Sequence, residues 1–526
     1  DISGLSADVG GEGRITASGK LSTQGAPRVD ALKAEITTPR ADRLLGLMPV
    51  SWPGFVRTWR GLTATLSADG PLTDLRTDAA MTVGETKLTV AGRFDGVHMR
   101  PSAEGDISIS APTLGALAAT LDADVAPDMA KKGAVEIYIP LNGDAQGYAV
   151  PALTATAGDI AIGGELTVKT NGPRPQVSAR LVGNLLPVLV PRNGAPPRRS
   201  SALAPRILPA AAPAVPTAPP APQEPAAAAA AAPLPAWAAL RDIDGDLAAS
   251  FDTVVAPRLS AQEVKLAARL NQGLLTLDDA TAKLLGGSLA ATGRADLTAI
   301  PKLSGTVNAK DIAVDAKSPL FSGNAPLAGT LTLAAEGEAA GGDADTLLRG
   351  LNGKGSLSVL NGSFAGANLG AVNDRLAKIK TLQDLISAFE AGSRGRTAFD
   401  RLNGSFTVAG GVLESRDLKL SAPSGEGSAT GTADLAARKV NADVRFALAS
   451  LKDAPPLGLR LQGAWESPRV FFDTGDFQGY MIQKGLKNLL RSLSKQKSSA
   501  DEPPPPKGKL KPKDVLREVL QAIPQK

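Results

Sequence analysis

Apolar and small polar residues alternate along most of the chain, in short segments that are separated by turn residues. Residues 87–94 (KLTVAGRF) and 440–448 (VNADVRFAL) show the alternation clearly, and turn residues recur about every 8 to 12 positions. A period of two gives each strand one apolar and one polar face. Such one-sided strands are typical of antiparallel sheets. The pattern therefore predicts a mainly β protein whose strands are mostly antiparallel.

One hairpin-like unit repeats within this pattern. Residues 273–297 and 411–435 align without gaps, and both end in A-T-G-x-A-D-L. Residues 84–96 (GETKLTVAGRFDG) are a looser relative of the same unit. Repeated units that cannot bury their own faces stack on one another. We therefore expect one elongated repeat sheet rather than several globular domains.

Helical periodicity is confined to few segments. Apolar residues recur every three or four positions over residues 366–391, which predicts an amphipathic helix packed on the sheet. A second apolar stripe with basic residues beside it begins after residue 480 and includes Lys484, Leu486, Lys487, Leu490 and Arg491. This pattern suits a helix on a membrane surface. It suits equally a helix that closes the end of the sheet.

A low-complexity segment divides the chain. Residues 194–236 contain twelve prolines and the run Ala226–Ala232, a composition that favours an extended spacer over a packed core. We therefore expect a β-repeat region over 1–193, an Ala/Pro-rich linker over 194–236, a β domain over 237–479, and a basic helix with a Pro/Lys-rich tail over 480–526.

Composition restricts the chemistry that the protein performs. The 526 residues include no Cys and one His, so disulfides, thiolate chemistry and histidine metal clusters are excluded. We find no phosphate-binding loop, nucleophile elbow or paired acid and base. The sequence therefore predicts a protein that is not an enzyme, with no catalytic residues, no cofactor and no metal site.

The net charge of +5 is unevenly distributed. Residues 480–526 carry eleven Lys and Arg against four Asp and Glu, a net charge of +7, so the preceding residues sum to −2. Nucleic-acid binding needs a clustered basic face. A nearly neutral body with 19 aromatic residues among 526 lacks that face, so we expect no nucleic-acid partner.

Several segments together resemble the AsmA family of Gram-negative envelope proteins, especially its C-terminal region. They are residues 351–368 (LNGKGSLSVLNGSFAGAN), 397–420 (TAFDRLNGSFTVAGGVLESRDLKL), 425–435 and 457–470 (LGLRLQGAWESPRV), preceded by the related rhythm of 240–297. The resemblance implies a long, curved antiparallel sheet that forms an apolar groove. It also implies a periplasmic protein held in the inner membrane by one helix. No stretch of the sequence is apolar for 18 residues, so we expect that anchor upstream of Asp1.

The same resemblance implies phospholipid transport between the inner and outer membranes, with acyl chains as partners. We expect the groove to be lined by alternate residues of three strands: Leu275, Leu277, Leu418, Leu420, Val444 and Phe446. For each of them, packing against other side chains or the 366–391 helix is the alternative. Two other functions stay open: a factor for outer-membrane protein targeting and assembly, whose sheet edge pairs with client strands and which acts with an envelope protein partner, and an adhesin-like β-solenoid.

Overall fold

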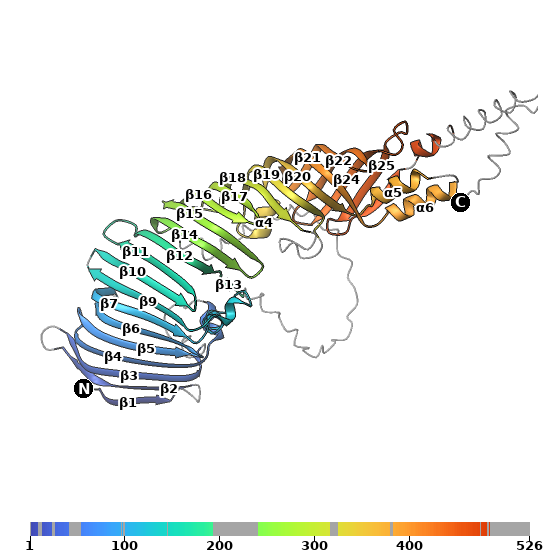
Figure 1. The fold of residues 1–526 in the computed structure, drawn as a ribbon. Helices are drawn as coiled ribbons and strands as arrows, with labels where there is room; N and C mark the ends of the chain where they lie inside the picture. The colour runs from blue at the N-terminus through green and yellow to red at the C-terminus, as the bar shows by residue number, and fades with distance from the viewer. Residues whose placement is uncertain are drawn as a thin grey trace, which may run out of the picture.

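The protein is one long curved sheet that carries a few short helices along its length (Figure 1). The computed structural model describes residues 2–8, 13–23, 27–41, 54–95, 97, 100–144, 146–192, 240–315, 325–378, 382–473, 475–480 and 483. The predicted linker and basic tail lie almost entirely outside the described residues. Within the described ranges, the main sheet has 24 strands. The predicted class, mainly β with an elongated curved sheet, is confirmed.

The first eleven strands of the main sheet follow one another in chain order. They are β1 (Ile2–Asp8), β2 (Arg14–Ser22), β3 (Arg28–Arg40), β4 (Arg60–Pro71), β5 (Leu75–Val83), β6 (Thr86–Asp95), β7 (Arg100–Ala111), β9 (Val135–Asp144), β10 (Gly147–Ala157), β11 (Ile160–Lys169) and β12 (Gln176–Pro187). Two short strands, β8 (Ala123–Asp124) and β13 (Val190–Pro191), pair with each other outside the main sheet.

Thirteen further strands continue the same sheet. They are β14 (Asp244–Ala256), β15 (Leu259–Asn271), β16 (Leu274–Leu284), β17 (Gly287–Asp296), β18 (Lys302–Val314), β19 (Leu327–Ala340), β20 (Asn352–Ala365), β21 (Arg396–Ala409), β22 (Val412–Ala422), β23 (Gly425–Asp434), β24 (Lys439–Leu448), β25 (Leu457–Ala464) and β26 (Arg469–Asp473). Each pairs with the strands before and after it, so β1 and β26 form the two edges.

The two halves of the sheet meet at β12 and β14. These strands pair in parallel over eleven positions, from Gln176–Asp244 to Pro187–Val255, whereas every other described pairing is antiparallel. Parallel neighbours require a connection that returns the chain to the starting end of the first strand. The chain between β12 and β14 contains the Ala/Pro-rich segment, which therefore serves as this crossover. The sheet itself is continuous across the junction.

The sequence repeat corresponds to two equivalent hairpins, β16–β17 and β22–β23. Both contain a register shift, between Leu277 and Ala280 in β16 and between Ser415 and Leu418 in β22. These positions are equivalent in the ungapped alignment of the two repeats. The repeat therefore specifies the bulge as well as the hairpin, because an extra residue in a strand is a local property of its sequence.

Short helices cover parts of the sheet. They are η1 (Gly54–Thr58), α2 (Leu114–Thr120), η2 (Met129–Lys131), α4 (Ala344–Arg349), α5 (Leu369–Leu376) and α6 (Leu382–Gly392). The single helix expected over 366–391 is thus two helices, which pack against each other. None of the helices that the structure describes is long and apolar enough to cross a membrane.

Most of the core lies along one margin of the sheet, which we call the capped margin. There, η1 covers Leu62 and Val83, and α2 with η2 covers the adjoining ends of β7, β9, β10 and β11. Farther along, α5 and α6 cover the ends of β20 to β26. Strands of alternating direction bring these ends to the same margin, and Figure 1 shows α5 and α6 beside the last strands. A smaller cluster around Leu297 lies at the opposite margin.

Candidate functional site

The strand registers assemble one apolar surface across almost the whole sheet. Directly paired residues lie on the same face, so a chain of pairs traces a row. One row contains Ala17, Ala34, Leu66, Ala79, Val90, Ile107 and Ile139. The next contains Leu153, Gly164, Leu181, Ala249, Leu266, Ala280, Ala291, Val307, Ala335, Gly355 and Phe406. We call this side the apolar face and the other the polar face.

Away from the helices, the apolar face is partly open to solvent. Leu66 is 38% exposed and Val307 is 39% exposed. In β19 the apolar face is nevertheless the more sheltered of the two, as two neighbouring alanines show. Ala335 on the apolar face is half-buried, whereas Ala334 on the polar face is exposed. The apolar face is thus only partly exposed to solvent, although no described helix lies over these residues. It extends over many strands.

A row of four paired glycines shows how the sheet bends toward this face. Gly293, Gly305, Gly337 and Gly353 pair in sequence across β17 to β20. A Cβ on Gly305 would lie 2.5 Å from the carbonyl oxygen of Thr292, and one on Gly353 would lie 2.4 Å from that of Glu336. The neighbouring backbones approach too closely on the apolar side to admit a side chain. We call these four positions the glycine crease. They need glycine, because only glycine has no Cβ.

The apolar face is hollowed near the N-terminal edge. A hollow of about 330 Å³ is lined by Ala34, Ile36, Ala64, Thr65, Leu66, Ala79, Ala80, Met81, Leu88 and Val90. Eight of these ten residues have their side chains on the apolar face by register. Aliphatic side chains of this kind offer dispersion contacts without directional hydrogen bonds, which suits a hydrocarbon chain better than a polar ligand.

The six predicted groove residues all lie on the apolar face, in two separate groups. The pairs Leu420–Gly427–Phe446 and Leu418–Ala429–Val444 place four of them side by side on β22 and β24. Leu275 and Leu277 lie on β16, several strands away. The alternation in the sequence thus predicts the shared face of these six residues, and their role as groove residues stays a prediction.

Burial separates these six residues further. Phe446 is 0% exposed and Leu420 is 7% exposed, and both belong to the core beneath α5 and α6. At these two positions the structure shows the alternative, which is packing against the helical segment. Val444 also packs against this core, and Leu275 packs against the cluster around Leu297. Leu275, Leu277, Leu418 and Val444 are partly exposed. The predicted membrane-surface residues Lys484, Leu486, Lys487, Leu490 and Arg491 lie outside the described residues.

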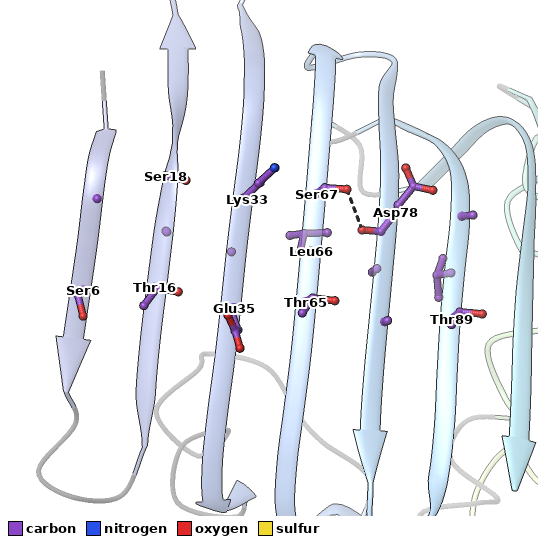
Figure 2. A pocket seen from close by; sticks show the side chains of 17 residues that line it. Ser6, Thr16, Ser18, Lys33, Glu35, Thr65, Leu66, Ser67, Asp78 and Thr89 are labelled. Atoms are coloured by element: carbon purple, nitrogen blue, oxygen red, sulfur yellow. Dashed lines mark hydrogen bonds between the residues drawn. The ribbon is translucent and has the colours of Figure 1, made fainter.

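The polar face has a different chemistry, which Figure 2 shows near the N-terminal edge. Ser6, Thr16, Glu35, Thr65 and Thr89 lie along one line across neighbouring strands, and Ser18, Lys33, Ser67 and Asp78 lie along the next. A hollow of about 730 Å³ is lined by these nine residues together with eight small or apolar ones, which include Leu66, Ala80 and Val90. Its hydroxyl and charged groups disfavour an acyl chain, because burying them without partners costs free energy.

Charges on the polar face pair across neighbouring strands. Lys354 lies opposite Glu336, with 3.0 Å between Nζ and Oε1, and Arg460 lies opposite Asp443, with 2.8 Å between Nε and Oδ1. The hydrogen bond and charge of Asp443 raise the pKa of Arg460. These pairs are exposed, so each contributes little to stability. Within the described ranges, no group of three or more His, Cys, Asp or Glu is placed to hold a metal ion.

Sequence reasoning missed most of the apolar face in the N-terminal half. Leu66, Met81 and Val90 lie on this face and are at least partly exposed, as are four of the predicted residues. The alternation of apolar and polar residues within 60–95 could have identified them. The glycine crease was also missed. The sequence signal for it is a glycine near the middle of each successive strand. In a single strand, such a glycine is normally interpreted as destabilising.

Comparison with known protein families gives one match. The model of a protein family described as the AsmA family matches residues 140–418, slightly more than half of the chain. The matched region runs from β9 to β22 and includes the parallel junction and the glycine crease. Neither a search of curated proteins nor a search of solved structures finds a match.

Proposed function

Because the chain belongs to the AsmA family, we propose that its apolar face binds phospholipid acyl chains and conducts them along the sheet between the inner and outer membranes. The observation that carries this proposal is the uninterrupted apolar row from β10 to β21, which crosses the parallel junction. Family membership and the large curved sheet fit a role in the cell envelope. The proposed role is non-catalytic, and the proposed location is the periplasm, with attachment to the inner membrane.

The uncovered apolar surface of the sheet is large for a monomeric protein. Monomeric proteins rarely expose contiguous apolar patches larger than a few hundred Å². Helices cover the apolar face mainly at the capped margin, and residues such as Leu66 and Val307 remain open. An acyl chain on this surface gains roughly 0.8 kcal/mol for each methylene that it buries. Small and aliphatic side chains offer no fixed polar contact, so a bound chain is free to slide along the row.

The polar headgroup needs a path in solvent. Because η1, α2, α5 and α6 cover long parts of the capped margin, the headgroup of a bound lipid would project toward the opposite margin. Paired charges on the polar face keep that face hydrated, which favours lipid on one side of the sheet only.

Adjacent residues on opposite faces provide a matched test. Val307→Asp places a charge on the apolar row, whereas Thr306→Asp places the same charge one residue away on the polar face. Both positions are exposed, so both variants are expected to fold. We expect native mass spectrometry of the purified protein to show copurifying phospholipid for wild type and Thr306→Asp, and strongly reduced phospholipid for Val307→Asp. Wild-type protein free of phospholipid, or equal loading of the two variants, would contradict the proposal.

A role in outer-membrane protein assembly by edge pairing is the alternative. The available edges are short, since β26 has five residues and β1 has seven. Short edge strands offer few backbone groups for pairing with a client strand. This feature favours the lipid proposal, and the Val307→Asp comparison separates the two because edge pairing does not involve the apolar row.

A further inference from the structure

The last strand carries an aromatic residue on the polar face of the sheet. In β26, Phe472 points to the apolar face, where its ring lies 5.2 Å from that of Phe389. Phe471 therefore points to the opposite face, and it is 54% exposed. Alternation calls for a polar residue at such a position. The core beneath α5 and α6 does not account for Phe471, because that core lies on the other side of the strand.

Three arginines lie on the same face as this ring, on the last three strands. Arg460 lies directly opposite Phe471 on β25. Arg445 on β24 and Arg469 on β26 are exposed on the same face. We call Phe471 with Arg445, Arg460 and Arg469 the Phe471 patch. It borders a hollow of about 850 Å³ whose lining includes Arg445, Arg460, Phe471 and the acids Asp443 and Asp473.

The acids in the hollow offset only part of the positive charge of the patch. Asp443 and Arg460 compensate each other in an ion pair. Asp473 accepts a hydrogen bond from the backbone N–H of Gly475 and keeps its negative charge, so the three arginines exceed the two acids by one positive charge. Among the described residues, neither Arg445 nor Arg469 makes an ion pair. The chain that follows this strand, residues 480–526, has a net charge of +7. Positive charge is thus concentrated at the C-terminal end of a chain whose remaining residues are nearly neutral.

We propose that the Phe471 patch docks the C-terminal end of the sheet on an anionic phospholipid surface. Guanidinium groups bind phosphate through paired N–H donors, and Phe side chains of membrane-surface segments insert at the boundary between headgroups and acyl chains. Each basic residue near an anionic bilayer strengthens binding, so a few of them beside one inserted ring produce reversible binding. This inference stands on exposure and charge and does not require transport along the apolar face.

The position of the patch favours a membrane over a second copy of the chain. Stable protein interfaces bury roughly 1,200 to 2,000 Å² around an apolar centre. The Phe471 patch offers one ring among charged groups on the last three strands, with β26 only five residues long. A bilayer needs no complementary shape, and its surface charge is opposite to that of the arginines and the following chain.

A single fluorescent label tests the contact directly. The chain contains no Cys, so Phe471→Cys in the full chain provides one site for an environment-sensitive fluorophore. Leu274→Cys is the matched control, because Leu274 is 43% exposed on the polar face far from the C-terminal edge. With vesicles of phosphatidylcholine and 30% phosphatidylglycerol, we expect a blue shift at position 471 and none at position 274. Pure phosphatidylcholine vesicles should give a much smaller shift.

Charge reversal tests the arginines. We expect Arg445→Glu with Arg469→Glu to lower partitioning onto the anionic vesicles by about tenfold or more, given the contribution of each basic residue near such a surface. Arg294→Glu with Lys310→Glu makes the same change of charge on exposed polar-face positions of β17 and β18, and it should have a much smaller effect. Phe471→Ser should also weaken partitioning, whereas Leu274→Ser should not.

Two outcomes would overturn the proposal. If vesicles bind the protein without a blue shift at position 471, residues outside the patch carry the contact. If the label shifts without vesicles as protein concentration rises, and light scattering shows a dimer, the patch contacts a second copy. Both outcomes leave the copurification test of the apolar face unaffected, so failure of this inference is distinguishable from failure of the proposed function.

Discussion

At the scale of single residues, Thr397 connects the sheet to the helices of the capped margin. It is 1% exposed at the start of β21. Its hydroxyl accepts a hydrogen bond from the backbone N–H of Leu369, at 3.0 Å, and donates one to the carbonyl oxygen of Ala367, at 2.8 Å. One buried side chain thus satisfies two backbone groups at the start of α5, where helix N–H groups otherwise lack partners.

Thr397→Val keeps the shape of this side chain and removes both hydrogen bonds. We expect it to lower the free energy of unfolding by about 1–3 kcal/mol, because the buried N–H of Leu369 loses its partner. Denaturant unfolding measures the change. Thr407→Val, at an exposed position of the same strand, should be nearly neutral. Equal stability of the two variants would show that the helices do not depend on this connection.

Asp417 illustrates a charged group that stabilises a bulge. The backbone N–H and the hydroxyl of Ser405 each donate to its carboxylate at 2.8 Å. These bonds favour the ionised form and hold the pKa of Asp417 below its ordinary value of 3.8. A folded-state pKa that is lower than the unfolded one stabilises the fold above the unfolded value, and this contribution is lost as the pH falls through the folded pKa.

Asp417→Asn should therefore change the pH dependence of stability. At pH 7 we expect the variant to be less stable than wild type, because the charge-assisted bonds are lost. As the pH falls below 3.8 the difference should shrink, and it should vanish once the wild-type carboxylate is protonated. Melting temperatures measured from pH 7 to pH 2.5 check this expectation. A difference that stays constant with pH would mean that the charge does not contribute.

At the scale of elements, the glycine crease and the helical caps determine how the strands use their alternation. Every strand of β17 to β20 contributes one glycine to the crease, so the bend belongs to the group of strands rather than to any one of them. The caps act on the same face but at its margin. Between crease and caps lies the open row that includes Val307.

Gly305→Ala tests the crease. The added Cβ would lie 2.5 Å from the carbonyl oxygen of Thr292, so the strands must move apart, and we expect a loss of about 1–3 kcal/mol in the free energy of unfolding. Faster hydrogen exchange in β17 and β18 should accompany this loss. Gly163→Ala is the control, since its nearest neighbours would be 3.9 Å away. If Gly305→Ala is as stable as Gly163→Ala, the close approach is not required.

At the scale of the whole molecule, the parallel pair β12–β14 makes one continuous sheet from two antiparallel halves. Gly245 lies at this junction, where a Cβ would be 1.9 Å from the carbonyl oxygen of Val177. Arg174 also donates a hydrogen bond to the carbonyl oxygen of Arg241 at 2.8 Å, just before β14 begins. The halves are therefore held together by direct contacts as well as by the connecting chain.

Cleavage of the connection tests this conclusion. A protease site inserted between Ala214 and Val215 allows the chain to be cut within the Ala/Pro-rich segment. We expect the two pieces to coelute from a sizing column, because eleven paired positions join β12 to β14. Adding Gly245→Val to the cut protein should separate them, since the new side chain disrupts the junction. Separation of the pieces without that substitution would contradict the expectation.

The sequence by itself determined the class of the fold, the apolar face of each strand and the equivalence of the two repeated hairpins. These properties are local, because alternation and a bulge depend on residues a few positions apart. All six predicted groove residues accordingly lie on the apolar face. Family membership was also accessible from the sequence, because the order of repeated strand patterns is itself a sequence property.

Only the tertiary structure decided which apolar residues are open. Phe446 and Leu277 follow the same alternation, yet α5 and α6 bury Phe446 while Leu277 stays partly exposed. The structure also decided that β12 and β14 pair in parallel and that four glycines form one crease. Each of these features depends on strands or helices that are distant in the chain. Alternation specifies where a side chain points, but burial depends on what other parts of the chain place above it.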